Sequence, residues 1–186
     1  MKVVDALTLS AAHRELLRPG ESLGDGEQAL PRFFYEVASW NEAKATQLTA
    51  HFTLAELMMV DCREADLLLR EFPHYVPCAV AVLARYLEEL RARVDPPVFI
   101  SVNGGYRSPA HGRAGGGASA HWWAAAADIY RIGDTWLDSQ RAIERYARIA
   151  EAIGREVFVK PFGHGIGETD DHLHLDLGRV TLVPRR

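Results

Sequence analysis

Residues 170–178, DDHLHLDLG, alternate polar and apolar side chains close to the end of the chain. Successive side chains of a β-strand point to opposite faces, so this stretch predicts a strand with two unlike faces. The apolar face is expected in the core, and the polar face is either an ordinary solvated surface or half of a metal site. The apolar face consists of Leu173, Leu175 and Leu177. The polar face consists of His172, His174 and Asp176.

The composition is that of an ordinary folded protein. The chain has 186 residues, of which 48% are hydrophobic and 25% charged, enough for one well-buried domain. A net charge of -4 and a pI near 6.1 provide no broad basic surface, which argues against a nucleic-acid partner. Arginine outnumbers lysine by eighteen to three, and its guanidinium suits carboxylate and phosphate recognition.

Cysteine usage and hydropathy bear on the compartment. Cys62 and Cys78 are too few for a disulfide scaffold and form no CxxC pair, so both are predicted to be small buried hydrophobes. Residues 1–17 have one early lysine and a short apolar stretch broken by Asp5, which makes a poor signal peptide. No later run approaches the roughly 18 apolar residues of a membrane span. We therefore expect no membrane span and a cytoplasmic location, with the oligomeric state left open.

Three segments have the spacing and end signals of helices, and others have those of strands. The first predicted helix begins at the capping box of Thr53 and Glu56. The second covers residues 77–94, with Pro77 in its first turn. The third covers residues 134–154, with Asp134 or Thr135 as the N-terminal cap and Gly154 as the C-terminal stop. Runs of β-branched and aromatic residues predict strands at 98–102 and 156–159, whereas residues 32–40 are compatible with a strand or a turn. These elements indicate an α+β fold: a single domain with helices packed on a small, mostly antiparallel sheet.

A metal site would need a second group of ligands, because a catalytic zinc site typically has three His, Asp or Glu ligands and one open position. Residues 119–128, SAHWWAAAAD, supply His121 and Asp128, seven residues apart. The alanines favour a helix, which would put both side chains on one face, two turns apart. An extended chain would put them on opposite faces unless it bends after His121. The spacing alone leaves these alternatives open.

Three motifs occur in a fixed order along the chain. They are GYRSP at residues 105–109; Ser119, His121, Ala126 and Asp128; and Asp171, His174, Asp176, Gly178 and Val180. In their order and spacing the chain resembles the zinc D-Ala-D-Ala metallopeptidases, which share their fold with the hedgehog signalling domain and include cell-wall carboxypeptidases, dipeptidases and phage endolysins. The resemblance covers about Phe52 to Val180. It implies a hedgehog/DD-peptidase-like fold, with residues 51–183 as a zinc metallopeptidase-like domain and residues 1–50 as an N-terminal extension to which the sequence assigns no role.

Carried over position by position, the resemblance implies that His121, Asp128 and His174 bind Zn²⁺. Asp171, three residues before the last ligand, is implied to be the general base toward a zinc-activated water. Arg107 is implied to hold the substrate and to stabilise negative charge as it develops. Both roles are physically reasonable for a carboxylate and a guanidinium beside a metal. The substrate-binding residues are expected to be Arg107, Ser119, His172 and Trp123.

Several of these positions have a plainer alternative. His172 is a ligand, a substrate-orienting group or a solvated side chain, and Asp176 is either a hydrogen-bond partner of a ligand imidazole or a surface carboxylate. Trp122 and Trp123 are either an aromatic wall for the substrate or part of the core. Ser119 is more simply a support for the ligand loop than a nucleophile, because no base is suitably spaced.

Two positions depart from the family pattern. Ala124 replaces the family glycine, and Gly112 stands where asparagine is common. Alanine at a glycine position can require a different φ or block a close backbone approach, which affects the loop path and the substrate pocket. The set of implied metal ligands is nevertheless complete.

The function predicted from these residues is that of a zinc metallopeptidase, a carboxypeptidase or endopeptidase that hydrolyses an amide bond in cell-wall, peptidoglycan-type peptides containing D-amino acids. The alternative is a non-catalytic, zinc-containing relative that binds a peptide or protein partner. Asp171 argues for the enzyme, since a binding module needs no base there. A cupin-type metal protein is set aside because no His or Glu follows His174. Which bond is cleaved is left open.

Overall fold

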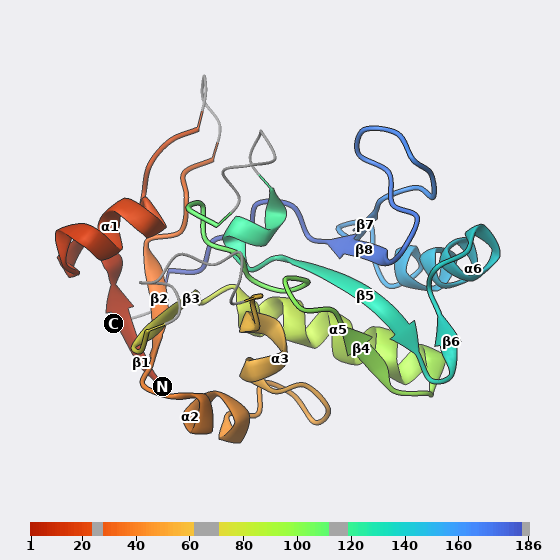
Figure 1. Ribbon diagram of the computed structural model, residues 1–186, viewed down its shortest axis with the longest axis horizontal. Coiled ribbons are helices and arrows are strands. Elements are labelled where there is room, and N and C mark those ends of the chain that lie inside the picture. Colours follow the sequence, from red (N-terminus) through yellow and green to blue (C-terminus); the bar gives the residue numbers. More distant parts are fainter. Residues whose placement is uncertain (24–27, 62–70, 112–118, 184–186) are drawn as a thin grey trace.

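The computed structural model describes residues 1–23, 28–61, 71–111 and 119–183, and these form two antiparallel sheets with helices around them (Figure 1). The strand order is β1-β2-β3 in the first sheet and β4-β5-β8-β7 in the second, where β6 also pairs with β5. The strands are β1 (Lys2–Asp5), β2 (Phe33–Val37), β3 (His74–Pro77), β4 (Val98–Ile100), β5 (Ala126–Ile132), β6 (Thr135–Trp136), β7 (Phe158–Val159) and β8 (Leu173–Asp176). The predicted α+β class is confirmed.

The helices of these described ranges surround both sheets. They are α1 (Ala11–Leu17), α2 (Trp40–Ala45), α3 (Leu54–Met58), α5 (Val80–Val94) and α6 (Gln140–Glu151), with 3-10 turns η1 (Ala6–Thr8) and η2 (Ala120–Trp123). None of them is long and apolar enough to cross a membrane.

The core continues from the first sheet into the space between the second sheet and the helices α5 and α6, which contact β5 and β8 (Figure 1). Leu83, Leu87 and Leu90 recur at helical spacing on α5 and are fully buried. From the sheet side, Leu173 and Leu175 of β8 are fully buried in the same cluster. The prediction that the leucine face of the histidine strand belongs to the core is therefore confirmed for these two side chains, while Leu177 is half-buried.

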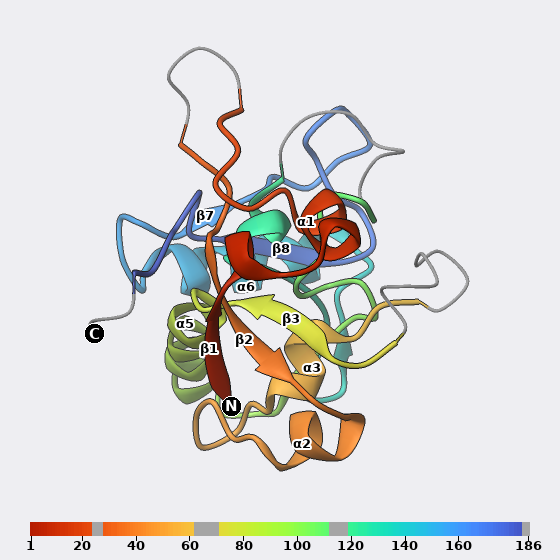
Figure 2. The ribbon, with the colours of Figure 1, turned by 90° about the vertical axis from the view of Figure 1, so that its left-hand side faces the viewer.

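The first sheet joins residues from both sides of position 50. Strand β2 pairs with β1 on one side and with β3 on the other, so the stretch that was compatible with a strand or a turn contains a central strand (Figure 2). The first 50 residues also contact the second half of the chain, because Trp123 Nε1 donates a hydrogen bond to the carbonyl oxygen of Ala29, 3.2 Å away. The division into residues 1–50 and 51–183 stays a prediction.

Two predicted helix starts are wrong, for identifiable reasons. Pro77 is not in the first turn of α5 but ends β3, opposite Phe34, where the edge position of the strand tolerates a residue without an N–H. The third helix begins after Ser139 rather than at residues 134–135, because Gly133, with φ +56°, turns β5 back into β6. It also ends at Glu151, before the predicted stop.

The helix predicted at Thr53 is confirmed but short. Glu56 Oε2 accepts hydrogen bonds from the backbone N–H of Thr53 at 2.8 Å and from its hydroxyl at 2.7 Å. Leu54, Leu57 and Met58 are buried on one side, as expected. Cys78 is buried as predicted, whereas Cys62 lies outside the described residues.

Candidate metal centre

Strand pairing brings two of the three expected ligands together. In the antiparallel register of β5 and β8, Asp128 lies directly opposite His174. Asp128 Oδ1 is 2.7 Å from Nδ1 of His174, and Oδ2 is 3.3 Å from Nε2 of His121. One potential ligand atom from each of the three residues lies within 4.8 Å of the others, and all three side chains are buried. The structure therefore places the predicted ligands in one group.

The conformation of residues 119–128, which the sequence left open, is a bend followed by a strand. The 3-10 turn η2 carries His121, and Ala124 ends it with φ +53° and ψ +36°, in the left-handed region. The chain then enters β5, so His121 folds back over the face that carries Asp128. Left-handed backbone is disfavoured for alanine by about 1–2 kcal/mol, which accounts for the glycine of the family pattern. Ala124 nevertheless adopts this left-handed conformation here.

One buried nitrogen of His121 has no hydrogen-bond partner. His121 Nδ1 lies 2.7 Å from the carbonyl oxygen of Gly105, and since a carbonyl can only accept, Nδ1 carries the hydrogen. The other ring nitrogen, Nε2, then presents a lone pair, and it is buried without a hydrogen bond. Burial also lowers the pKa of this imidazole, which favours the neutral form. A neutral, oriented imidazole with a free lone pair is the form in which histidine binds a metal.

His174 lies between two carboxylates. Its Nδ1 faces Asp128 Oδ1 at 2.7 Å and its Nε2 faces Asp176 Oδ2 at 3.0 Å. Burial lowers the pKa of the ring, but the two carboxylates outweigh burial, so the pKa is raised. Of the two alternatives for Asp176, the structure shows the hydrogen-bond partner of a ligand imidazole. Its other oxygen accepts a hydrogen bond from the N–H of Gly178, which fixes the carboxylate in place.

Asp128 remains ionised despite its burial. Burial raises the pKa of this carboxyl, but the imidazoles of His121, His172 and His174 more than compensate and hold it well below its usual range. Arg107 adds a permanent positive charge, with Nη2 3.5 Å from Asp128 Oδ2. A permanent carboxylate and two imidazoles form a donor set that suits Zn²⁺.

Asp171 and His172 lie at the outer edge of this group. The Asp171 carboxylate is 78% exposed and accepts a hydrogen bond from Nδ1 of His172 at 2.5 Å. His172 Nε2 is 3.4 Å from Asp128 Oδ1. Burial lowers the pKa of His172, but Asp128 and Asp171 together raise it. His172 therefore links the expected general base to the ligand carboxylate, a contact that the strand alternation alone did not reveal.

The sequence between residues 50 and 176 matches the family model of Peptidase M15. The chain belongs to the Peptidase M15 family. A search of curated proteins and a search of solved structures gave no match. M15 metallopeptidases are zinc-dependent, and the group of His121, Asp128 and His174 is positioned to bind such an ion. The resemblance to the zinc D-Ala-D-Ala metallopeptidases is confirmed at the level of this family.

The turn at residues 104–108, which contains most of the GYRSP motif and is called the M15 turn below, is held against strand β5 by close backbone packing. Asp128 N donates to the carbonyl oxygen of Gly104 at 2.8 Å. A Cβ on Gly105 would lie 2.3 Å from the carbonyl oxygen of Leu57, so only glycine allows this approach. The same packing presents Arg107 to Asp128 and the Gly105 carbonyl to His121. Sequence reasoning missed this backbone acceptor, although its signal was the glycine pair before Tyr106.

The remaining predicted site residues have mixed surroundings. Ser119 Oγ caps η2, 3.4 Å from the backbone nitrogen of His121, which agrees with support of the ligand loop. Trp123 is fully buried, packs with Leu30 and has no exposed surface to offer a substrate. Trp122, half-buried, packs beside it. Gly112, the second departure from the family pattern, lies outside the described residues.

Proposed function

We propose that this M15 metallopeptidase hydrolyses an amide bond in peptidoglycan-type peptides that contain D-amino acids. The observation that carries the proposal is the buried Nε2 of His121, which makes no hydrogen bond and lies 3.3 Å from the Asp128 carboxylate, beside the His174 imidazole. Such a nitrogen is costly to bury in a protein that binds no metal. The cell-wall substrate is supported by the three motifs shared with the D-Ala-D-Ala metallopeptidases.

When bound, zinc would supply a Lewis acid that polarises the scissile carbonyl and lowers the pKa of a water to about 7. The chain contributes the surrounding groups. Arg107 has a half-exposed guanidinium 3.5 Å from Asp128, from which it can donate to a substrate carboxylate or to the oxygen that becomes negative. Asp171 is the proposed general base, and His172 holds its carboxylate at the edge of the ligand group.

The alternative is a non-catalytic, zinc-containing relative that binds a peptide or protein. The exposure of Asp171 favours this alternative, because the carboxylate contacts His172 and none of the three ligands. A base that acts on water beside the metal has to come within hydrogen-bond reach of that water, although catalytic hydrogen bonds often tighten only when the substrate is bound.

The experiment is hydrolysis of defined peptides by the zinc-loaded protein. The substrates are a stem-peptide analogue ending in D-Ala-D-Ala and one containing L-Ala-D-Glu, and the products are identified by mass spectrometry. A chelator should abolish cleavage and zinc should restore it. Asp171→Asn should lower kcat by about 10²–10⁴-fold with zinc retained, and Arg107→Ala should lower it by about 10²–10³-fold.

Asp170→Asn is the matched control for Asp171→Asn. Asp170 is the neighbouring carboxylate, and it pairs with the exposed His164 rather than with the ligand group. Its substitution should leave the rate within about two-fold. Failure of the zinc-loaded protein to cleave either peptide, together with saturable binding of one of them, would favour the non-catalytic alternative.

A further inference from the structure

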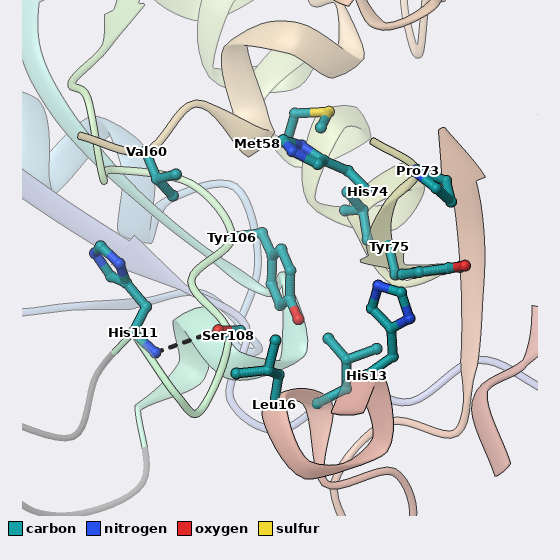
Figure 3. A pocket seen from close by; sticks show the side chains of 12 residues that line it. His13, Leu16, Met58, Val60, Pro73, His74, Tyr75, Tyr106, Ser108 and His111 are labelled. Carbon is teal, nitrogen blue, oxygen red and sulfur yellow. Dashed lines mark hydrogen bonds between the residues drawn. The ribbon is translucent and has the colours of Figure 1, made fainter. Parts of the chain in front are cut away.

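A cavity lies beside the M15 turn, with Tyr106 and Ser108 in its lining. It is a partly open cavity of about 50 Å³ between α1, the end of α3, β3 and residues 106–111 (Figure 3). Its buried base is formed by Leu17, Met58, Val76, Tyr106 and Ser108. This volume is several times what one water molecule requires, so the cavity admits a small group. None of these residues belongs to the group of metal ligands.

The Tyr106 hydroxyl points into this cavity and lacks a partner. Tyr106 is 7% exposed, and its Oη is buried without a hydrogen bond to any described residue. Figure 3 shows the ring in the middle of the cavity with the hydroxyl directed toward Leu16 and His13. Burial of an unsatisfied hydroxyl costs about 1–3 kcal/mol, which phenylalanine would avoid at this position. The hydroxyl therefore indicates a missing hydrogen-bond partner.

The lining favours an uncharged occupant. Most of the described residues around the cavity are aliphatic or aromatic, none is Asp, Glu, Lys or Arg, and the polar ones include the imidazoles of His13, His74 and His111. Burial raises the pKa of the Tyr106 phenol, so the hydroxyl stays neutral and can donate or accept one hydrogen bond. Met58 at the base adds a flexible side chain that adapts to ligand shape.

We propose that this cavity binds a small, uncharged, mainly apolar group that carries one polar atom for the Tyr106 hydroxyl. Such a group occurs in a free small molecule or in a side chain of a bound peptide. Tyr106 and Ser108 line the cavity, and Arg107 between them reaches Asp128 on the other side. An occupant therefore contacts both neighbours of the arginine. Only the second source, a peptide side chain, rests on the proposed peptidase function.

The test uses p-cresol and toluene as probes of the full chain, followed by NMR of ¹³C-labelled methionine methyl groups. The two probes have the same apolar body and differ in one hydroxyl. Met58 lines the cavity, whereas Met59 is 39% exposed and serves as the internal control. We expect a saturable shift at Met58 alone and about five-fold tighter binding of p-cresol than of toluene, as one net hydrogen bond provides.

Variants separate the hydroxyl from the cavity. Tyr106→Phe should remove the preference for p-cresol and leave toluene binding unchanged, and Leu16→Trp should fill the rim and weaken both probes at least ten-fold. Tyr130→Phe, at a half-buried tyrosine outside the cavity, should change neither affinity. No saturable shift at Met58, or equal affinity for the two probes in the native protein, would overturn the proposal and leave a cavity filled by water.

The two sources are distinguished with the peptide substrates. If p-cresol raises KM for a cleaved peptide, the cavity takes a side chain of that peptide. If KM is unchanged while Met58 still shifts, the occupant is a free molecule. The methyl shifts can be measured on the His174→Ala protein as well, so an absence of peptidase activity would not affect the binding result.

Discussion

On one face of the β5–β8 pair, Ala127, Ile129, Leu173 and Leu175 are fully buried in the main hydrophobic core, whereas the other face buries Asp128, His174 and Asp176. The apolar face stabilises the fold without any partner outside the chain. The polar face is also buried, though less completely, and it holds mutually paired charges, whose burial contributes little net stability. The apolar face of these two strands therefore serves folding, and the polar face serves metal binding. Substitutions on each face should therefore separate the two properties.

The largest expected effect is the loss of metal from the polar face. His174→Ala should lower zinc affinity by about 10⁴-fold or more, because it removes one of three protein ligands. Zinc per chain is measured by elemental analysis after dialysis, with circular dichroism to verify folding. His164→Ala is the matched control, since that imidazole is 80% exposed and pairs with Asp170. Full zinc retention in folded His174→Ala would refute the ligand assignment.

A substitution on the apolar face should lower stability and leave zinc binding intact. Leu175→Ala should lower the free energy of unfolding by about 2–5 kcal/mol, through lost burial and the cavity left behind. Urea denaturation in the presence of a chelator measures this quantity without any contribution from metal. Leu182→Ala, at a position 38% exposed, should stay within about 0.5 kcal/mol of the native protein. If Leu175→Ala lost zinc while still folded, the separation of the two faces would be incorrect.

A smaller loss of zinc affinity is expected from a change in Asp176, which contacts the ligand His174. Asp176→Asn keeps the shape of the side chain but removes the charge that faces Nε2 of His174. We expect zinc affinity to fall by about 10–100-fold with little change in stability. Competition against a zinc-binding dye measures the affinity, and Asp138→Asn, an exposed carboxylate, is the control. An unchanged affinity would mean that the Asp176 contact does not tune the ligand.

The remaining prediction concerns Cys78, whose thiol is not among the three expected metal ligands. Burial raises the pKa of the Cys78 thiol to about 11. Since the thiolate is the reactive form, iodoacetamide at pH 8 should modify Cys78 about 100-fold more slowly than an exposed cysteine with a pKa near 9. The rate is measured by mass spectrometry in Cys62→Ser, so that one thiol is followed.

The same pKa shift predicts a dependence of stability on pH. The unfolded chain ionises this thiol near pH 9 and the folded chain near pH 11, so stability is complete below pH 9 and falls as pH rises through 11. Cys78→Ala should remove this component. Rapid modification of native Cys78 at pH 8 would contradict the burial of the thiol.

The success of sequence reasoning differed between local and non-local features. The alternation of residues 173–176 indicated a two-faced strand because a strand's period of two is local to its own sequence. The placement of His121 and Asp128 stayed open because alanine favours a helix, and only pairing with β8 makes residues 126–132 a strand. Pro77 was misplaced for a similar reason, since its edge position depends on β2, about 40 residues earlier.

The first sheet and the Tyr106 cavity were not predicted. Strands β1 and β2 are short and pair across about 30 residues of sequence, so neither shows a clear period of its own. The cavity is lined by four segments that lie far apart in the sequence, and none of them alone indicates a cavity. Features that arise only when distant segments meet carry little signal in any one of them.

The close contact of Gly105 with Leu57 places a weak point of the metal centre outside its ligands. A methyl group at position 105 would collide with the carbonyl oxygen of Leu57 and displace the acceptor that orients His121. Zinc binding could thus be lost in a natural variant whose His121, Asp128 and His174 are all intact. A survey of genomes that counted the three ligands alone would record such a protein as active. A survey that also required glycine at position 105 would detect the loss of zinc binding.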